Sequence, residues 1–556
     1  MRKTKIICTL GPSTDEENII KNLILNGMDV ARLNMSHQDI PLQKKRSDMI
    51  KKVRKELSSY TALLLDTKGP EVRIGKIKDN CALLEKDKTF TLTTKNIIGN
   101  SSGASITFDK LPKEVKVGST ILIDDGLIEL KVIKCSETDI TCKIINGGTL
   151  SSNKGINVPD IRLSLPFISD KDAQDIRFAV EENFDFIAAS FTRSAKDIEM
   201  LRQELEKHNG NHIQIIAKIE NSDGVQNIDE IIRVSDGIMV ARGDLGVEIP
   251  IEDIPIIQKK IIKKAYDVGK HVITATQMLD SMIKNPRPTR AESTDIANAI
   301  YDGTSAIMLS GETAAGKYPI ESLKTMAKIA IRAENDIDYK KRLEKRFLNE
   351  KPNITSAISH ATCTTAHDLC AKAILTLSRS GRTVQMISKY RPSCPIIGGA
   401  SNENVLRQMN LCWGAIPVLT QEQKNTDLLF DHIAKKAYEK NYLDNGDLVV
   451  ITAGVPIGIS GTTNLLKVHL VGTVLASGTG INQRQAKAKL CVCSNEKEAL
   501  EKFNPGDILV IPKTSNNILS ILRQAAGIIA EEGEPKDIFS NPKNPRTKEF
   551  LKRIIR

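Results

Sequence analysis

Mostly apolar runs that alternate with helical stretches dominate the first part of the chain. Such runs are typical of parallel strands that are buried on both faces. They occupy residues 5–10, 30–34, 62–66, 186–190, 213–219, 237–241, 271–275 and 306–309. Eight strand–helix repeats predict an α/β fold of the TIM (β/α)8 barrel type, in which side chains at the C-terminal strand ends meet at one mouth.

Charged residues follow two neighbouring strands of this predicted barrel. One run ends in Lys218 and Glu220, the next is followed by Arg242 and Asp244, and a short helix is predicted between them at residues 222–234. Two carboxylates on adjacent strand ends suit one Mg²⁺ ion, because substrate oxygens complete its coordination. For an isolated KxE motif, a surface ion pair near a tight turn remains the alternative.

Two glycines flank Asp244 in what is predicted to be a strand-end loop. Gly243 and Gly246 carry no Cβ, so the backbone on both sides of Asp244 could approach a ligand closely. This arrangement favours a binding site over the surface ion pair.

The third repeat is interrupted at residues 71–166 by short β-rich pieces with Gly and Asn between them. We predict an inserted β-barrel lid that closes over the barrel mouth and excludes water. From about residue 353 the pattern becomes an open α/β domain, with a helix at 355–371 and strands at 373–378, 395–400, 448–454 and 467–472. The predicted domains are 1–70 with 167–345 (barrel), 71–166 (lid), 346–472 (α/β effector domain) and 473–556 (a swivelling-type α/β domain with a basic tail).

Composition and charge narrow the class of protein. The formal net charge is +11, but residues 536–556 hold seven basic and two acidic residues, so 7 − 2 = +5 of it lies in the tail. A positive field also suits an enzyme with anionic phosphate substrates, and only 4% aromatic residues argues against base stacking, so no nucleic-acid partner is expected. No stretch approaches the ~20 apolar residues of a membrane span, which predicts a cytoplasmic protein.

Ten cysteines are scattered along the chain without a repeated CxxC motif, which predicts reduced thiols. Cys491 and Cys493 form the one close pair, and strand alternation would place both on the same face. Simple packing is favoured there over metal binding.

Several long segments together resemble pyruvate kinase. The segments AKIENSDGV and MVARGDLGVEIP are similar to its active-site region, and CTLGPST, ARLNMSH, LLDTKGPEVR, ATQMLDSM, PRPTRAE and MLSGETAAGKYP follow the family in order. The resemblance covers residues 1–472 and implies transfer of a phosphoryl group from phosphoenolpyruvate to ADP, followed by protonation of the enolate. It also implies a homotetramer.

The resemblance implies roles for individual residues. Arg32 and Lys218 are expected to neutralise the moving phosphoryl group, and Glu220 with Asp244 to hold Mg²⁺ (or Mn²⁺). The backbone at Gly243 with Asp244 is expected to meet the substrate carboxylate. Thr276 is expected to orient a water-linked proton path, although a capping hydroxyl is the alternative. The nucleotide phosphates are assigned to Arg73 and Lys154, and the roles of Ser310 and Glu312 are left open.

A monovalent cation site is implied as well. Asn34, Ser36, Asp66 and Thr67 are similar to the family's K⁺ ligands. In TKGPE the family carries either a glutamate, which leaves the site dependent on K⁺, or a lysine, which supplies a built-in ammonium. Glu71 therefore predicts dependence on K⁺.

The loop SRSGRT follows a predicted strand and precedes a predicted helix, so its backbone N–H groups could cradle a phosphate. Its residues Ser378, Ser380, Gly381, Arg382 and Thr383 are predicted to bind a phosphorylated effector, with a plain polar loop as the alternative.

Residues 473–533 resemble the extra C-terminal domain of some bacterial pyruvate kinases, itself similar to a mobile phosphohistidine domain. The segment EEGEPKDIFSNPKNPRTKEF has no histidine, which argues against phosphoryl transfer there.

Three other interpretations fit parts of the sequence. The segment GETAAGKY fits a P-loop except that Tyr318 replaces the hydroxyl residue that binds Mg²⁺, which argues against it. Another Mg²⁺-dependent barrel, such as a lyase, would use the same carboxylates, but the lid argues against it. A non-catalytic sensor or nucleic-acid-binding protein would need a damaged site, and these residues are intact.

Overall fold

The computed structural model describes residues 1–36, 39–159, 161, 163–347, 353–421, 426–455, 463–472, 486, 488–511 and 514–530. Two compact units divide the chain. One comprises Met1–Leu443 and Leu448–His469, and the other comprises Asp444–Asp447 and the residues from Leu470 onward.

Eight parallel strands form a closed barrel, which confirms the predicted (β/α)8 fold. Their order around the barrel is β1 (Lys5–Thr9), β17 (Ala306–Leu309), β16 (His271–Ala275), β15 (Gly237–Ala241), β14 (Gln214–Ile219), β13 (Phe186–Ala189), β3 (Ala62–Asp66) and β2 (Val30–Asn34). These strands are buried almost throughout, as their continuous apolar runs require.

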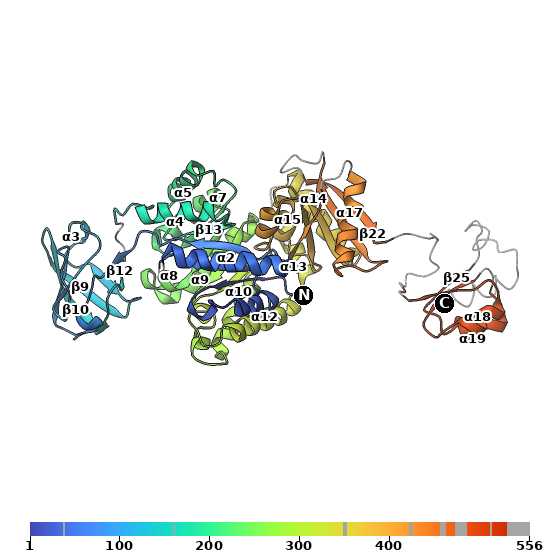
Figure 1. The fold of residues 1–556 in the computed structure, drawn as a ribbon, viewed down its shortest axis with the longest axis horizontal. Coiled ribbons are helices and arrows are strands. Elements are labelled where there is room, and N and C mark those ends of the chain that lie inside the picture. The colour runs from blue at the N-terminus through green and yellow to red at the C-terminus, as the bar shows by residue number, and fades with distance from the viewer. Residues whose placement is uncertain are drawn as a thin grey trace. The chain divides into compact units, whose positions relative to one another are not determined.

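Helices surround the barrel strands (Figure 1). They include α1 (Glu17–Leu25), α2 (Ile40–Glu56), α4 (Asp170–Glu181), α5 (Ala195–Lys207), α9 (Ile254–Asp267), α10 (Arg290–Asp302) and α12 (Pro319–Asp336). A large apolar core fills the space between helices and strands. A second core lies inside the barrel, where Ile7, Val30, Leu64 and Ile216 pack with Leu411 of the α/β domain.

Two local predictions between β14 and α9 were wrong. The helix predicted at residues 222–234 is two helices, α6 (Ser222–Gln226) and α7 (Ile228–Val234). The two helices are separated at Asn227. The side-chain Nδ2 of Asn227 donates to the carbonyl of Arg193, and such side-chain bonds to the backbone compete with a continuous helix.

The loop predicted around Asp244 is also a helix. It is α8 (Arg242–Glu248), which begins directly after β15. Neither Gly243 nor Gly246 adopts positive φ, so nothing in the backbone prevents a helix. Asp244 lies in the first turn, where a carboxylate is favoured by the helix dipole.

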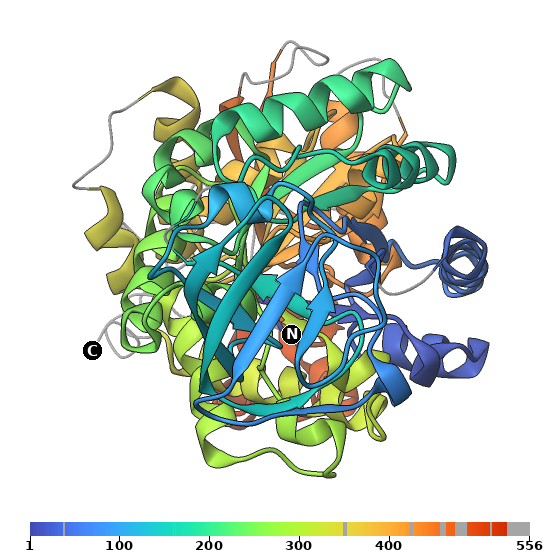
Figure 2. The same ribbon diagram turned by 90° about the vertical axis from the view of Figure 1, so that its left-hand side faces the viewer.

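The insert between β3 and α4 is a β-barrel, as predicted. Seven strands pair in the order β4 (Val72–Arg73), β12 (Gly155–Asn157), β8 (Thr120–Ile123), β9 (Ile128–Cys135), β10 (Asp139–Asn146), β6 (Thr89–Thr93) and β7 (Gly103–Ser105). The two ends of this sheet meet, because Ile74 bridges Ile106 and the Gly75 N–H donates to Ser105 O at 2.8 Å. A smaller sheet pairs β5 (Ala82–Leu84) with β11 (Gly148–Leu150). Figure 2 shows the long strands of the insert face-on, in blue to cyan.

The α/β domain contains a five-stranded sheet of order β20 (Ala415–Leu419), β19 (Ile396–Ala400), β18 (Ala373–Leu377), β21 (Leu448–Gly454) and β22 (Thr463–Leu470). Its helices include α14 (Ile354–Asp368), α15 (Arg382–Lys389), α16 (Glu403–Met409) and α17 (Thr426–Glu439). Strand β20 was missed from the sequence because it contains Pro417. It lies at the sheet edge, where a proline that cannot donate a hydrogen bond is tolerated.

The second unit contains a three-stranded parallel sheet of β23 (Leu490–Val492), β24 (Ile508–Ile511) and β25 (Gly527–Ala530), with α18 (Glu496–Lys502) following the first strand. Cys491 and Cys493 are both buried, with their Sγ atoms 3.6 Å apart, which confirms that they share one face. The basic tail at residues 536–556 lies outside the described residues.

Within the part of the chain that the structure describes, no helix is both long and apolar enough to cross a membrane. The predicted domain boundaries at residues 70, 166, 345 and 472 stay predictions.

A buried histidine makes the stability of the barrel depend on pH. His271, at the start of β16, is 4% exposed, and burial lowers its pKa from 6.5 to about 4 despite the nearby Asp236. Below pH 6.5 His271 binds a proton in the unfolded chain, whereas in the folded barrel it stays neutral down to about pH 4. Stability is therefore present above pH 6.5 and is lost as the pH falls toward 4, by up to about 3 kcal/mol.

We expect His271→Gln to flatten this acid limb, measured as the apparent Tm between pH 7 and pH 4. The exposed His212→Gln is the matched control and should keep the wild-type slope. Equal slopes for His271→Gln and wild type would contradict this assignment.

Candidate active site

Strand alternation places a polar layer directly above the apolar interior of the barrel. Successive residues of a strand point to opposite faces, so a residue two positions after an inward-facing one also points inward. Ile7, Val30, Leu64 and Ile216 line the apolar interior. The residues two positions further along the same strands are Thr9, Arg32, Asp66 and Lys218.

Lys218 is the centre of this layer. Its Nζ lies 2.9 Å from Asp66 Oδ1, 2.9 Å from Glu220 Oε1 and 2.8 Å from Ser190 Oγ. Burial would lower the pKa of Lys218, but Asp66 and Glu220 outweigh it and hold the pKa above its ordinary value. The ammonium is thus charged and directed at fixed partners.

The burial of Lys218 makes it important for the fold as well as for the site. It belongs to β14 and is only 8% exposed, and its removal would leave two buried carboxylates without their cation. Breaking such a buried pair typically costs about 3–5 kcal/mol.

Asp66 is held between two cations. Arg32 Nε lies 2.6 Å from Asp66 Oδ2, while Lys218 occupies Oδ1. Burial opposes ionisation of Asp66, but Arg32 and Lys218 together hold its pKa below the ordinary value. Arg32 also donates to Thr9 Oγ1 at 2.8 Å, so its guanidinium is fixed in direction.

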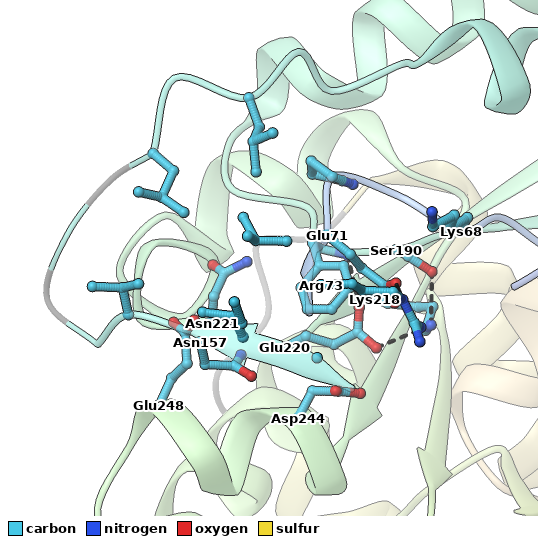
Figure 3. Close-up of a pocket in the computed structure, with 18 of the residues that line it drawn as sticks. Lys68, Glu71, Arg73, Asn157, Ser190, Lys218, Glu220, Asn221, Asp244 and Glu248 are labelled. Carbon is cyan, nitrogen blue, oxygen red and sulfur yellow. Dashed lines mark hydrogen bonds and ion pairs between the residues drawn. The ribbon is translucent and has the colours of Figure 1, made fainter. Parts of the chain in front are cut away.

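Glu220 and Asp244 face the same cavity as Lys218 (Figure 3). Burial raises the pKa of Glu220 to about 7, although Lys218 opposes this, and the negative charge of Asp244 adds to the rise. Burial likewise raises the pKa of Asp244. Two buried carboxylates that resist ionisation beside each other are the donor set that a divalent cation would neutralise.

Among the described residues, no group of three or more His, Cys, Asp and Glu side chains forms a complete metal cage. A divalent ion at Glu220 and Asp244 would therefore need further oxygens from a substrate or from water, as Mg²⁺ sites in phosphoryl-transfer enzymes do.

Thr276 lies opposite the start of α8. Its Oγ1 accepts a hydrogen bond from the Gly243 N–H at 2.8 Å and donates to Ala275 O at 2.7 Å. The Thr276 hydroxyl therefore acts as the capping group that the sequence left as an alternative, because Gly243 belongs to the first turn of α8. The same contact occupies the N–H that was assigned to a substrate carboxylate.

The residues assigned to K⁺ gather where β2 and β3 end. Asn34 and Asp66 are direct partners in the register of these strands, and the Asn34 carboxamide oxygen accepts from the Ser36 N–H at 3.0 Å. Thr67 O accepts from Ser190 Oγ at 2.7 Å. The set is rich in oxygen, which fits a large monovalent cation, and Asp66 within it already pairs with both Arg32 and Lys218.

Glu71 forms an ion pair with the residue assigned to the nucleotide. Its Oε2 lies 2.6 Å from Arg73 Nε. The lid also brings Arg73 beside Lys154, because β4 pairs with β12 and Ile74 N donates to Lys154 O at 2.8 Å. Lys154 in turn pairs with Asp124 at 2.7 Å.

A cavity of about 580 Å³ lies between the lid and the barrel mouth. Arg73 and Lys154 line it from the lid, and Lys218, Glu220 and Asp244 line it from the barrel. Sequence reasoning did not assign several other lining residues, namely Lys68, Asp124, Asp125, Asn157, Arg193 and Glu248. Lys68 and Arg193 each lie shortly after a barrel strand, so their position was the signal that could have found them.

Ser190, the last residue of the strand predicted at 186–190, is central to the site. Its hydroxyl donates to Thr67 O, contacts Asp66 Oδ1 at 3.0 Å and accepts from Lys218. A serine after a buried strand is too common for the sequence alone to reveal this role.

Glu312 and Ser310 hold the opposite side of the mouth. The Glu312 carboxylate accepts from the N–H groups of Leu279 at 2.9 Å and Ser310 at 2.7 Å. Glu312 therefore fixes the loop that follows β16, while the Ser310 hydroxyl is buried and has no hydrogen-bond partner among the described residues.

The loop assigned to an effector lies between β18 and α15. Gly381 has φ +79°, a conformation that glycine adopts without strain, and precedes the first residue of α15. Thr383 N–H donates weakly to Ser378 Oγ at 3.4 Å, and Arg382 donates to Gln385. Arg379 and Ser380 line a second cavity of about 420 Å³, which contains none of the barrel-mouth residues.

Comparisons with known proteins agree over most of the chain. The family model "Pyruvate kinase, barrel domain" matches residues 1–323, and "Pyruvate kinase, alpha/beta domain" matches residues 356–469. A pyruvate kinase of Sporosarcina psychrophila is 47% identical over 535 residues, which are 96% of this chain and 91% of that protein. One from Geobacillus stearothermophilus is 46% identical over 534 residues, with the same coverage of both chains.

A solved structure agrees as well. The crystal structure of a pyruvate kinase from Cryptosporidium parvum is 39% identical, covers 85% of this chain and 96% of its own, and superposes with a TM-score of 0.80.

Proposed function

The chain belongs to the pyruvate kinase family, whose members use metal ions to transfer the phosphoryl group of phosphoenolpyruvate to ADP, and we propose that this transfer takes place at the barrel mouth. Membership in this family decides against the lyase and the non-catalytic sensor that the sequence left open. Its reaction yields pyruvate and ATP.

The observation that carries the proposal is the charged Lys218 between Asp66 and Glu220. Phosphoryl transfer develops charge on the moving oxygens, and catalysis comes mainly from positioned cations. Lys218 and Arg32 are both fixed by Asp66, so neither side chain needs to reorganise when the phosphoryl group passes from phosphoenolpyruvate to ADP. We assign both to the stabilisation of that group.

Glu220 and Asp244 would hold Mg²⁺ or Mn²⁺ on the substrate. Their raised pKa values fit this role, because a divalent cation removes the penalty of ionising two adjacent buried carboxylates. Bound there, the ion would draw charge from the phosphoryl oxygens and the enolate oxygen.

Thr276 and Gly243 would meet the rest of phosphoenolpyruvate. The Gly243 N–H now bonded to Thr276 Oγ1 would be shared with the substrate carboxylate. A threonine hydroxyl is too weak an acid to protonate the enolate alone, so Thr276 would orient a water-linked path to carbon C3.

Arg73 and Lys154 would bind the phosphates of ADP. Each is held by a carboxylate of the lid, Glu71 and Asp124 respectively, so both cations are presented to the cavity. Because they lie on the insert, movement of the lid and ADP binding would be coupled.

Asn34, Ser36, Asp66 and Thr67 would hold K⁺. Regulation by a phosphorylated effector at Ser378, Ser380, Gly381, Arg382 and Thr383, assembly as a homotetramer and a cytoplasmic location complete the proposal. These rest on family resemblance.

The test of the central assignment is Lys218→Ala. We expect kcat to fall by more than about tenfold, because a cation of the transition state is lost. Pyruvate formation from phosphoenolpyruvate is measured with and without ADP, at a temperature where circular dichroism reports a folded protein.

Lys259→Ala is the control, since Lys259 is exposed and pairs with Asp302 at the surface. In parallel, Glu220→Gln should raise the Mg²⁺ concentration needed for half-maximal rate. A folded Lys218→Ala enzyme that keeps more than about a tenth of the wild-type kcat would contradict the assignment of Lys218 to the phosphoryl group.

Glu71→Lys tests the cation site. We expect wild-type activity to require K⁺ or NH₄⁺ and to be poor in Na⁺, whose smaller radius would contract the oxygen shell. A lysine at this position should relieve much of that requirement. It would also break the ion pair with Arg73, so the KM for ADP should rise.

Rates are compared in potassium and in potassium-free sodium buffer, with the exposed lid residue Glu85→Lys as a charge-matched control. Full wild-type activity in the sodium buffer would refute the K⁺ site.

The effector site is tested with a Ser380→Glu, Arg382→Glu double variant. Added negative charge should repel a phosphate, so activation or inhibition by a phosphorylated ligand should be lost while the basal rate stays. Fructose 1,6-bisphosphate, ribose 5-phosphate and AMP are the probes, and Lys435→Glu on the exposed face of α17 is the control. An equal response of variant and wild type would place the effector elsewhere.

A further inference from the structure

The turn that carries Thr276 is strained. Thr276 has φ +68° and Gln277 has φ +52°. Left-handed backbone is unfavourable for a β-branched residue such as threonine, because its side chain crowds the backbone there. Such a conformation persists only where surrounding contacts hold it.

Those contacts come from the side chain of Arg242, the first residue of α8. Arg242 Nη2 donates to Thr276 O at 2.6 Å, and Nε donates to Ala275 O at 3.3 Å. One planar guanidinium therefore holds two successive carbonyls of the strained turn. Only 11% of the Arg242 side chain is exposed, so water competes little for these bonds.

Asp295 of α10 fixes the other edge of the guanidinium. Arg242 Nη1 lies 2.8 Å from Asp295 Oδ1 and 2.6 Å from Oδ2. The carboxylate leaves Nε and Nη2 directed at the turn. Asp295, Arg242 and Thr276 are all absent from the lining of the 580 Å³ cavity. Asp295 contacts Arg242, which in turn contacts Thr276, so an effect of Asp295 on chemistry would pass through Arg242.

We propose that Arg242 and Asp295 are positioning residues for enolate protonation, which hold Thr276 in its left-handed conformation with Oγ1 against the start of α8. This inference rests on the proposed role of Thr276. Two hydrogen bonds connect α8 to the turn: Arg242 donates to the carbonyl of Thr276, and the Gly243 N–H donates to the hydroxyl of Thr276.

Loss of this contact should release only a short segment. Beyond Gln277 the chain is held independently, because Leu279 N–H donates to Glu312 Oε1 at 2.9 Å. The phosphoryl-binding groups Lys218 and Arg32 bond to Asp66 and not to the turn. The two halves of the reaction should therefore respond differently.

The experiment measures both halves in Asp295→Asn and Arg242→Lys. Protonation is followed as exchange of the pyruvate methyl hydrogens with deuterated water, by NMR, with ATP, Mg²⁺ and K⁺ present. Phosphoryl transfer is followed as the initial rate of ATP formation. A lysine keeps the charge of Arg242 but cannot serve three acceptors in one plane.

We expect exchange to fall by about tenfold or more in both variants, while ATP formation changes by less than about threefold, since small misplacements of a positioning group are costly to the step it serves. Asp295→Glu should restore part of the exchange, because its carboxylate can still hold the guanidinium. Asp302→Asn, a carboxylate at the other end of α10, should leave both rates unchanged.

Thr276→Ala separates this inference from the role on which it rests. If Thr276→Ala loses exchange but Asp295→Asn does not, the positioning role is overturned while Thr276 stands. If Thr276→Ala keeps normal exchange, both are overturned. A parallel fall of exchange, ATP formation and Mg²⁺ affinity in Asp295→Asn would mean that the pair positions α8 and Asp244, and would also overturn the proposal.

Discussion

The site depends on charge balance inside a low-dielectric barrel. Arg32 and Lys218 supply two positive charges, Asp66 and Glu220 supply two negative ones, and the four groups pair at 2.6 to 2.9 Å. An unpaired buried charge would be too costly to keep, so each member requires the others. Asp244 adds one carboxylate beyond this balance, and its negative charge adds to the rise that burial causes in the pKa of Glu220.

The strands of the barrel could be predicted because their signal is local. Strands β2, β3, β15, β16 and β17 begin and end at the predicted residues, since each apolar run stops where a polar group enters the mouth. The segment at residues 242–248 was misread because glycines beside an aspartate suggest a loop, whereas α8 is stabilised by the capping contact from Thr276, a residue distant in sequence. Strand β20 was missed because Pro417 masks it, and only its place at the sheet edge explains why it is tolerated.

For the candidate site, family motifs indicated residues that the fold brings together, but they did not indicate the partners of those residues. Nothing in the sequence links Lys154 with Asp124, or Arg242 with Asp295. Such pairs depend on which loops the fold brings together, and a motif records only residues that are close along the chain. Asp295 was overlooked because a single aspartate within a helix has no distinguishing sequence signal.

The packing of Leu411 has a consequence for how the chain becomes folded. This leucine belongs to the α/β domain, yet it is fully buried in the same cluster as Ile7, Val30 and Ile273 of the barrel. The barrel interior is therefore incomplete until a segment more than a hundred residues beyond its last strand has been made. During synthesis, the barrel would expose apolar residues of its interior until the segment with Leu411 has been made. The barrel and the α/β domain would then complete folding as one cooperative unit.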